Sequence, residues 1–329
     1  MKRHKTLIVS GRIVEKIVTI KDAIKAVEKA FRFSGKGKAE MPPKIYVHLE
    51  KYNGDFRAMP AYLEGLKRCG IKWVNVHPGN RRKNLPTVMA IIILSDPSNG
   101  LPLCIMEGTY ATALRTGAAG AVAAKYLAKK NSQKVALVGC GIQAKTQLVG
   151  LNKLFKIKEV KVWGPERKEA RTFKKEMQKL IPSKIELSDS VKSCVKDADI
   201  IVTTTPSRKP LVRLEWITEG AHINAIGADA KGKQELAPEI LKKAKVVVDA
   251  WGQAFHSGEI NVPLSKGQIT KKDIYADIGE IAAGEKKGRT KEKELTVFDS
   301  TGLAVQDIAI ADLVYKKAKK LKIKKYLEF

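Results

Sequence analysis

The chain has 329 residues, of which 44% are apolar, and carries a formal net charge of +28 at pH 7. A chain of this length and apolar content can bury a full core and favours two domains. The densest apolar run, Val88 to Leu94, is too short to span a bilayer, and no small-residue cleavage site follows the few apolar residues at the N-terminus. We therefore expect neither a membrane protein nor a secretory signal.

The positive charge has two interpretations, a nucleic-acid-binding surface or a lysine-rich surface that is simply solvated. Lysines are spread along the whole chain and recur in amphipathic segments such as Glu166–Lys179 and Tyr315–Lys325. No DNA-reading helix and no RNA-binding aromatic motif accompanies them. We favour the solvated surface and predict no nucleic-acid partner.

The four cysteines are scattered and form neither a C-x-x-C pair nor a metal-like pattern with histidine: Cys69, Cys104, Cys140 and Cys194. Thiols used in this way are typical of a reducing compartment, where they are small core or loop residues. We therefore predict a cytoplasmic protein without a metal site.

The first 130 residues predict a helix, several strands and a second helix. Apolar residues recur at helical spacing from Ile20 to Phe33, and glycines at positions 35 and 37 end this helix. Strand-like runs separated by turn-forming residues follow: Lys44–Leu49, Phe56–Tyr62, Ile71–His77 and Thr87–Ser95. Strands joined in this way favour a mixed or antiparallel sheet. An Ala-rich helix is predicted over Thr112–Lys130.

From Lys134 onward strands and helices alternate. Strands are predicted at Val135–Val138, Val160–Trp163, Ile200–Thr204, His222–Ile226, Val246–Asp249 and Thr296–Asp299. Helices are predicted at Gln143–Lys153, Arg167–Ile181, Val191–Lys196 and Pro238–Lys243. This alternation predicts an α/β fold with a doubly wound parallel sheet. A final amphipathic helix, Ala304 to Lys320, can return to the N-terminal part.

The segment Lys134–Gln147 contains a glycine-rich turn between a buried strand and a helix. Gly139, Gly141 and Ala144 occupy the three small positions of a G-x-G-x-x-G/A fingerprint, which permit the turn, the approach of a pyrophosphate and close packing of the helix on the strand. The anion would bind the unpaired N–H groups at the helix start. A dinucleotide site is favoured over the alternative, an ordinary tight turn without a ligand.

Three cations lie in or beside the predicted strands before residue 100: Lys44, Arg57 and Lys72. A buried cation needs a partner, so cations clustered in strands indicate an anionic one. Arg binds carboxylates through two N–H groups, and a desolvated Lys can have a lowered pKa suited to proton transfer. The alternative is that strand alternation points each cation toward solvent.

Polar residues also follow several strands of the parallel sheet, where ligands bind. Asp229 comes after the strand that begins at His222, as either an acid/base group or a helix N-cap. Thr204 and Thr205 end another strand and can line a cofactor, and Ser300 begins a polar turn after the last strand. Arg115 is predicted at a helix start, facing the phosphate region.

These segments resemble the ornithine cyclodeaminase and mu-crystallin family, most closely its archaeal alanine dehydrogenase branch. The resemblance is carried by MPPKIY, DFRAMPAY, GIKWVNVHPGN, LPTVMA, LRTGAAGAVAAKYLA, VGCGIQA, VTTTPSRKP, HINAIGAD, GEINVPLS and FDSTGLAVQD, which together run from about Met41 to Asp307. It implies a Rossmann-type dinucleotide-binding domain over 119–304. It also implies an N-terminal α+β domain for substrate binding and dimerisation, over 1–118 with 305–329.

The same resemblance implies roles for individual residues. Lys72 and Asp229 are the expected catalytic residues. Arg57 and Lys72 are expected to hold the substrate carboxylate, and Lys44 is a further expected substrate-binding residue. The cofactor-binding set comprises Arg115, Gly139, Gly141, Ile142, Gln143, Ala144, Gly164, Glu166, Arg167, Thr204, Thr205, Ile226, Gly227, Ala228, Lys233 and Ser300.

The choice between NAD and NADP is open in the sequence. NAD enzymes usually place an acid after the second strand to bind the ribose 2′-hydroxyl, and that position is Gly164 here. Glu166 can substitute for the acid, or Arg167 and Lys168 can bind a 2′-phosphate.

The expected function is an NAD(P)-dependent L-alanine dehydrogenase that reversibly converts the amino acid to the 2-oxo acid and ammonia, and acts as a homodimer. Hydride leaves Cα, and Asp229 with Lys72 handles the protons. An ornithine or lysine cyclodeaminase and a ketimine reductase share part of this chemistry and remain alternatives. A non-enzymatic NAD(P)H-binding protein is an alternative of another class.

Overall fold

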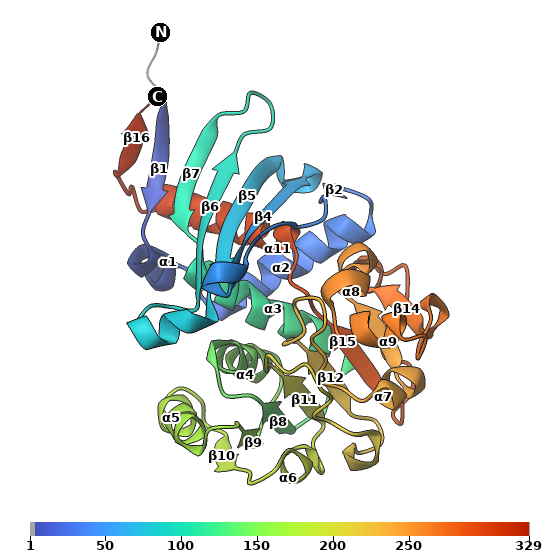
Figure 1. Ribbon diagram of the computed structural model, residues 1–329. Coiled ribbons are helices and arrows are strands. Elements are labelled where there is room, and N and C mark those ends of the chain that lie inside the picture. The colour runs from blue at the N-terminus through green and yellow to red at the C-terminus, as the bar shows by residue number, and fades with distance from the viewer. Residues whose placement is uncertain (1–3, 329) are drawn as a thin grey trace. The chain divides into compact units, whose positions relative to one another are not determined.

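The computed structural model describes residues 4–328. The chain divides into two compact units (Figure 1). The first unit extends to Arg115 and includes the residues from Leu303 onward, and the second unit is Thr116–Gly302. The division falls inside helix α3 (Thr109–Leu127).

The first unit contains a mixed sheet with the strand order β16-β1-β7-β6-β5-β4-β2, and β3 pairs with β4. Its strands are β1 (Lys5–Val9), β2 (Ala39–Glu40), β3 (Ile45–Leu49), β4 (Gly54–Leu63), β5 (Arg68–Val76), β6 (Val88–Ser95), β7 (Pro102–Glu107) and β16 (Tyr326–Glu328). Its helices besides the start of α3 are α1 (Gly11–Ile17), α2 (Ile20–Gly35), α11 (Ala304–Lys320) and three 3-10 turns at Glu50–Tyr52, Glu64–Leu66 and Pro78–Lys83. The pair β1–β7 is parallel and the other pairs are antiparallel.

Two helices cover one face of this sheet. Helix α11 packs against α2 and crosses β4, β5, β6 and β7 (Figure 1). Helix α2 begins at a capping box in which the backbone N–H of Asp22 donates to the Thr19 hydroxyl and the Asp22 carboxylate accepts from the backbone N–H of Thr19. The Lys317 ammonium binds the Asp22 carboxylate at 2.5 Å, so the last turns of α11 are fixed to the start of α2.

The second unit contains a parallel sheet with the order β10-β9-β8-β11-β12-β15-β13-β14. Its strands are β8 (Lys134–Val138), β9 (Glu159–Trp163), β10 (Lys184–Leu187), β11 (Ile200–Thr203), β12 (His222–Ala225), β13 (Lys245–Val248), β14 (Ile274–Asp277) and β15 (Thr296–Asp299). Its helices are the rest of α3, α4 (Ile142–Leu154), α5 (Arg167–Met177), α6 (Val191–Val195), α7 (Pro238–Lys243), α8 (Trp251–Ser257), α9 (Asn261–Ser265), α10 (Ile278–Ala283) and two 3-10 turns at Leu214–Trp216 and Lys271–Asp273.

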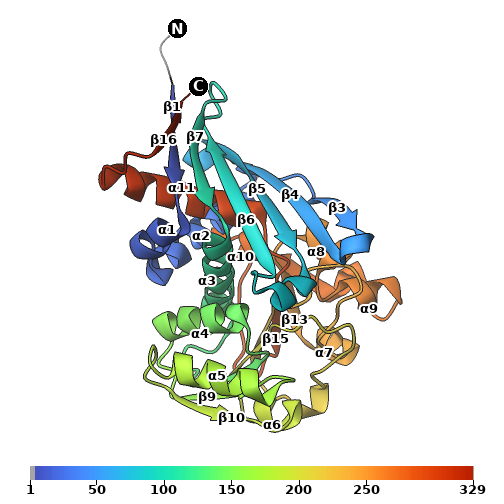
Figure 2. The same ribbon diagram turned by 60° about the vertical axis from the view of Figure 1, so that its left-hand side comes forward.

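Both faces of the parallel sheet are covered, and successive side chains along a strand point alternately into two hydrophobic cores. Apolar residues of α4 and α5, such as Leu148 and Phe173, pack on one face with Val162. Residues of α6 and α7, such as Cys194 and Leu241, pack on the other face with Val246. Figure 2 shows α4 and α5 beside β9 and β10. The predicted fold class, a doubly wound parallel sheet with a further α+β part, is confirmed.

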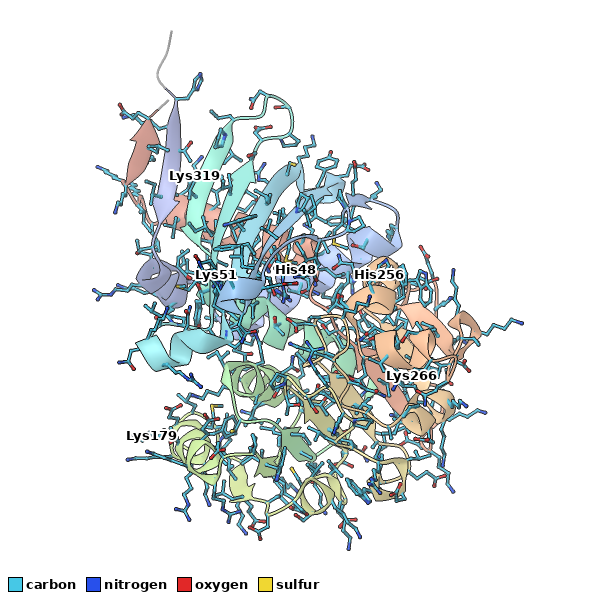
Figure 3. All side chains as sticks on the ribbon, in the orientation of Figure 1. His48, Lys51, Lys179, His256, Lys266 and Lys319 are labelled. Atoms are coloured by element: carbon cyan, nitrogen blue, oxygen red, sulfur yellow. The ribbon has the colours of Figure 1, made fainter. Side chains whose placement is uncertain are left out.

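The lysines come from many elements. The labelled residues Lys51, Lys179, Lys266 and Lys319 lie on four separate segments, and each is exposed (Figure 3). Within residues 4–328 no helix combines the length and the apolar character needed to cross a membrane. The four cysteines are free thiols.

Candidate functional site

Arg57 and Lys72 share the helix-covered face of the first unit's sheet. Arg57 on β4 is paired with Val74 on β5, and Met59 with Lys72, so both cations point to the same side as these apolar residues. The Lys72 side chain is 1% exposed and that of Arg57 is 7% exposed. The alternative that strand alternation points these two cations toward solvent is therefore wrong.

Asp307 lies between two of the cations. Its Oδ2 atom is 2.8 Å from the Lys72 Nζ, and its Oδ1 accepts a hydrogen bond of 3.1 Å from the Arg115 Nε. Arg115 also donates through Nη1 to the Gln306 side-chain oxygen at 3.1 Å. Asp307 is fully buried in the first turn of α11, where the helix N-terminus favours a carboxylate.

Asp307 was not among the predicted site residues. The available signal was its place in the segment FDSTGLAVQD, at the start of the last amphipathic helix. An acid at that place is also typical of a solvated first turn, so the sequence did not separate the two interpretations.

Arg57 is held in a fixed orientation. It donates to Asp55 through Nε at 2.7 Å and through Nη2 at 3.2 Å, a two-bond contact. Its guanidinium carbon lies 5.2 Å from the centre of the Tyr46 ring. The chain itself therefore supplies two of the anionic partners that the clustered cations required, Asp55 and Asp307.

Positive charge nevertheless exceeds negative charge among these residues. Four cations (Lys44, Arg57, Lys72 and Arg115) accompany the two carboxylates. Burial of the ammonium, together with the nearby charges of Arg115 and Lys44, lowers the pKa of Lys72 to about 7, although Asp307 opposes the shift. The cluster can therefore hold a small carboxylate and exchange a proton near neutral pH.

The position of Arg115 differs from the prediction. Helix α3 begins at Thr109, three residues before the predicted start at Thr112, so Arg115 lies in its second turn and not at the helix start. The Glu107 carboxylate accepts from the backbone N–H groups of Thr109 and Tyr110, which stabilises the earlier start. A contact between Arg115 and a cofactor phosphate stays a prediction.

The glycine turn of the second unit has the geometry of an anion site. Gly139 has a φ of +112°, and a Cβ there would lie 2.5 Å from the Thr204 hydroxyl. Gly141 has open space around it and precedes α4, which no described side chain caps. Ala144 is fully buried against the sheet. The first N–H groups of this 13-residue helix can therefore bind a phosphate.

A second feature fits a bound dinucleotide. The Ser300 hydroxyl follows β15 at the carboxyl ends of the strands, and it is a buried polar atom without a hydrogen-bond partner among the described residues. Such a group is expected to bind a ligand or water. The backbone N–H of Ser300 donates to the Ala225 carbonyl at 3.0 Å, which places it beside the end of β12.

Asp229 follows β12 in a turn. The next helix, α7, begins at Pro238 with Ala237 as its N-cap, so the alternative of Asp229 as a helix cap is wrong. Its carboxylate accepts from the Lys233 ammonium at 2.5 Å, and its side chain is 33% exposed. Asp229 is thus an accessible carboxylate in an ion pair, and Lys233, predicted to bind the cofactor, is its partner.

The end of β9 carries the residues predicted to read the ribose. A Cβ at Gly164 would lie 2.5 Å from the Cys140 sulfur, so this position has little room for a side chain. Glu166 is the N-cap of α5. Arg167 binds the Asp189 carboxylate at 2.5 Å.

Thr205 and Gly227 are tied to one buried acid. Glu235 accepts from the Thr205 backbone N–H at 2.6 Å, from its hydroxyl at 2.7 Å and from the Gly227 N–H at 2.9 Å. Thr204 instead bonds through its backbone N–H to the Val138 carbonyl at 2.9 Å. Glu235 was not predicted, because no pattern places an acid there.

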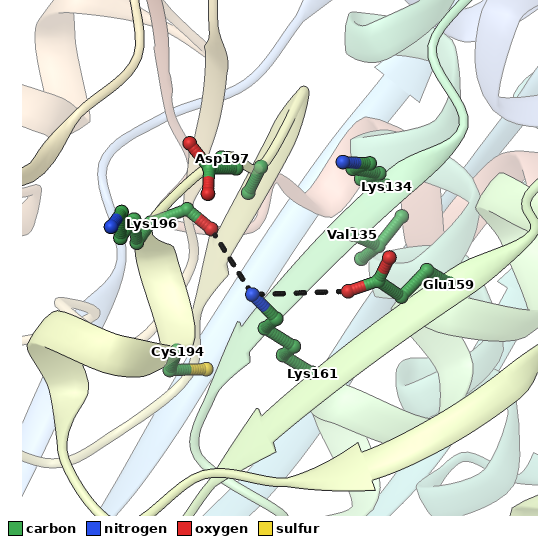
Figure 4. Close-up of a pocket in the computed structure, with 8 residues that line it drawn as sticks. Lys134, Val135, Glu159, Lys161, Cys194, Lys196 and Asp197 are labelled. Carbon is green, nitrogen blue, oxygen red and sulfur yellow. Dashed lines mark hydrogen bonds and ion pairs between the residues drawn. The ribbon is translucent and has the colours of Figure 1, made fainter.

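A small hollow lies at the amino ends of the parallel strands, by the first residues of β8 and β9 (Figure 4). Its volume of about 10 Å³ matches a single water molecule. The Lys161 ammonium there is 3.8 Å from the Glu159 carboxylate and 3.5 Å from the Lys196 carbonyl oxygen. This hollow is not a ligand site. Within residues 4–328, no group of His, Cys, Asp and Glu side chains is placed to hold a metal ion.

Known proteins resemble this chain over nearly its whole length. An alanine dehydrogenase of Archaeoglobus fulgidus is 53% identical over 314 residues, which are 95% of each chain. The solved structure of an archaeal alanine dehydrogenase dimer with bound NAD has a TM-score of 0.95 and 50% identity, and covers 99% of this chain and 100% of that one. Thermococcus litoralis Δ1-pyrroline-2-carboxylate reductase, solved with NADH and L-proline, has a TM-score of 0.94 and 40% identity, and covers 96% and 98%.

The model of the ornithine cyclodeaminase/mu-crystallin family matches residues 4–322. The chain therefore belongs to the ornithine cyclodeaminase/mu-crystallin family.

Proposed function

We propose that this protein is an NAD-dependent L-alanine dehydrogenase, which converts L-alanine, water and NAD⁺ to pyruvate, ammonium, NADH and a proton in a reversible reaction. The observation that carries the proposal is the buried Lys72, whose pKa is lowered to about 7 among surplus positive charges. The 53% identity with an alanine dehydrogenase over 95% of both chains supports alanine as the amino acid.

The residues of the first unit bind the substrate carboxylate. Asp55 and Tyr46 orient the Arg57 guanidinium, so little side-chain entropy is lost when Arg57 binds an anion. Lys44 adds a second positive charge, which acts on Lys72. Because Arg57 and Lys72 are buried, their charges interact with a carboxylate more strongly than they would in water.

Lys72 and Asp229 are the proton-transfer groups. With a pKa near 7, the Lys72 amine can take a proton from the alanine ammonium at neutral pH and return it in the reverse reaction. The Asp229 side chain is 33% exposed, so its carboxylate can take a proton from the water that adds to the imine. Asp307 orients the Lys72 amine through its 2.8 Å contact.

The residues of the second unit bind the cofactor. The start of α4 holds the pyrophosphate, and the buried Ser300 hydroxyl is a partner for the nicotinamide end. When bound, NAD supplies the hydride acceptor for the Cα–H bond of alanine. NAD is favoured over NADP because Glu166 can bind the ribose hydroxyls, while Arg167 is engaged with Asp189.

The protein is a homodimer whose interface includes the open face of the first unit's sheet. Ile45, Trp73 and Ile91 lie in one cross-strand row on that face, and their exposed fractions are 62%, 43% and 51%. Phe56 stacks on Trp73 at 5.2 Å. A contiguous apolar face of this kind favours a protein partner, and a similar alanine dehydrogenase was solved as a dimer.

The protein acts in the cytoplasm, where its four free thiols stay reduced. Its basic surface is solvated and has no nucleic-acid partner, because the exposed lysines come from many separate elements.

A substrate panel with both cofactors tests the function. L-alanine with NAD⁺ is expected to yield NADH and pyruvate, and NADP⁺ is expected to react more slowly. The proposal would be rejected if neither cofactor supported the oxidation of alanine or the reductive amination of pyruvate with ammonia.

A second candidate is a cyclic-imine reductase. It is favoured by the pyrroline-2-carboxylate reductase solved with L-proline, which is 40% identical to this chain. Oxidation of NADH by Δ1-pyrroline-2-carboxylate, without reaction of pyruvate and ammonia, would establish this activity instead. Proline formed from ornithine without net reduction would indicate a cyclodeaminase.

A further inference from the structure

Three buried acids lie in series at the carboxyl ends of the parallel strands. Glu235, Glu259 and Asp299 come from different segments of the second unit, and each is fully buried. The roles proposed above for the second unit use none of them. Burying a carboxylate costs free energy unless hydrogen bonds satisfy it. The donors around each acid therefore show which parts of the backbone that acid fixes in place.

Glu235 connects two strand ends. Its Oε1 accepts from the backbone N–H and the hydroxyl of Thr205, just after β11, and its Oε2 accepts from the N–H of Gly227, just after β12. Both oxygens therefore face donors, with distances from 2.6 to 2.9 Å. Only an ionised carboxylate presents acceptors at both positions.

The other two acids hold Glu235 in turn. The Glu259 carboxylate accepts from the backbone N–H groups of Glu235, at 2.9 Å, and of Leu236, at 2.6 Å. The Asp299 carboxylate, at the end of β15, accepts from the N–H groups of Glu259 at 2.9 Å and Ile260 at 3.1 Å. Each acid thus binds the backbone of the next, from β15 to the ends of β11 and β12.

We propose that Glu235 is a positioning residue of the dinucleotide site, whose carboxylate fixes Thr205 and Gly227, and that Glu259 and Asp299 fix Glu235. The inference rests on the proposed NAD-dependent function, because Thr205 and Gly227 are cofactor-binding residues only in that function. Glu235 acts through these two residues and touches no reacting atom. Fixed strand ends let the cofactor bind without first ordering two loops.

The ionisation of Glu235 gives the proposal a measurable consequence. Burial raises the pKa of Glu235 to about 7, and its hydrogen bonds with Thr205 and Gly227 oppose the shift. The titratable groups beyond it are Glu259, whose pKa is raised by burial and by the Glu235 charge, and Asp299, whose charge acts on Glu259. Below pH 7 a protonated Glu235 turns one oxygen into a hydroxyl that opposes an N–H donor, so one contact is lost.

The test compares Glu235→Gln with a matched control. Gln keeps the size of the side chain but places an NH₂ group against either the Thr205 or the Gly227 N–H. The control is Glu294→Gln, the same change in an acid that binds Lys245 at 2.7 Å and Thr290 at 3.1 Å, by the first residues of β13 and β15. The dissociation constant of NADH is measured by fluorescence from pH 6 to 8.5, with thermal unfolding as a check on folding.

Wild type and Glu294→Gln should bind NADH several-fold more weakly at pH 6 than at pH 8.5. Glu235→Gln should bind roughly ten- to a hundredfold more weakly at all these pH values, because an unsatisfied buried donor remains, and it should lose the pH dependence. If Glu235→Gln does not fold, Thr205→Val removes one donor and should weaken NADH binding while keeping the pH dependence.

Two failures can be distinguished. If wild type binds NADH but Glu235→Gln has the affinity and pH profile of wild type, the positioning role is overturned and the proposed function stands. Where Thr205→Val takes its place, a wild-type affinity for NADH overturns the role in the same way. If wild type binds neither NADH nor NADPH, the proposed function itself fails, and the positioning role with it.

Discussion

The burial of Lys72 affects both the stability of the fold and the pKa of its ammonium group. An ammonium that is 1% exposed is desolvated, which disfavours its charged form, and Asp307 only partly compensates. The same burial that costs folding energy brings the pKa of Lys72 to about 7, the range in which a proton-transfer group works best.

Replacing Lys72 by Met should abolish both proton transfer and one carboxylate contact. We expect kcat for alanine oxidation to fall by roughly a hundredfold or more and KM for alanine to rise. The dissociation constant of NADH should not change, because Lys72 is not among the cofactor-binding residues. Steady-state kinetics and a fluorescence titration measure these quantities, and unchanged kcat in a folded variant would refute the role.

Asp229 is the second residue whose role can be tested sharply. Asp229→Asn keeps the shape but removes the proton acceptor, so kcat should fall by roughly a hundredfold or more with little change in melting temperature. The remaining structural explanation is the ion pair with Lys233, at 2.5 Å and partly exposed. Lys233→Gln breaks the same pair and is the control, with kcat measured at saturating NAD⁺ because Lys233 is also a predicted cofactor-binding residue. If Lys233→Gln reduces kcat as much as Asp229→Asn, the ion pair and not acid/base chemistry explains the loss.

His222 offers a prediction about pH and stability. Burial lowers the pKa of His222 from 6.5 to about 3, and its ring nitrogens contact Thr296 and Asn224 at 2.9 Å. The folded state thus keeps His222 neutral while the unfolded state takes up a proton below pH 6.5. The contribution of His222 is therefore fully present above pH 6.5 and is lost as the pH falls toward 3, by up to about 1.4 kcal/mol per pH unit.

The measurement is urea unfolding of wild type and His222→Gln at pH 7, 5.5 and 4. The stability advantage of wild type over the variant should shrink at each step. Glu235 has a pKa raised to about 7 and acts in the opposite direction between pH 4.5 and 7, but it is present in both proteins and cancels in the difference. A constant difference would show that His222 is not kept neutral by the fold.

At the scale of elements, α3 and α4 approach so closely that glycine is required. A Cβ on Gly117 would overlap the backbone carbonyl of Thr146, and one on Gly150 would lie 2.7 Å from the Gly117 carbonyl oxygen. Backbone atoms cannot rotate away as a side chain can, so the helices would have to move apart. Helix α4 begins at the glycine turn, and its displacement would also move the proposed pyrophosphate site.

Gly117→Ala should therefore destabilise the protein by about 1–3 kcal/mol and weaken NADH binding. Gly252→Ala is the matched control, because Gly252 lies in α8 with open space around it and should tolerate or favour alanine. Thermal unfolding and NADH titration of both variants check this. Equal behaviour of the two variants would mean that a Cβ on Gly117 does not force α3 and α4 apart.

Much of the architecture was predictable because the local pattern agrees with the tertiary role. Val135–Val138 is apolar throughout and became a central strand, and the helix starting at Ala304 was predicted from its spacing. The pattern did not predict β1, β2, β7, β10, β14 or β16. Strand β16 exists through pairing of Leu7 with Tyr326, residues at opposite ends of the chain, and no local pattern reports such a contact.

The residues of the site were predictable where local sequence indicates burial, and not where they depend on distant contacts. Lys72 was identified because apolar neighbours in a strand made its burial plausible, and the structure buries it. Asp307 and Glu235 were not predicted because the role of each depends on contacts with other segments of the chain. Lys72 and Asp307, for example, are 235 residues apart (307 minus 72). Spacing within a segment carries no information about such contacts.

At the scale of the whole molecule, the first unit's sheet has two unlike faces. One face carries the buried cations beneath α11, and the other carries the apolar row of Ile45, Trp73 and Ile91. A monomer would leave this row in water, at a cost of about 25 cal/mol for each Å² of apolar surface. A second copy of the chain can cover it through a two-fold interface, in which the same row serves both subunits.

The double variant Trp73→Glu/Ile91→Glu should therefore be a folded monomer where wild type is a dimer. Each subunit would bring two carboxylates into the interface, and burying unpaired like charges costs several kcal/mol, so the dimer dissociation constant should rise by roughly a hundredfold or more. Leu180→Glu is the control, because Leu180 is 69% exposed but lies in the second unit, outside the row. Light scattering at micromolar concentration should show a dimer for wild type and for the control. A double variant that remains dimeric would place the interface elsewhere, since two subunits cannot bury four facing carboxylates without a loss of affinity.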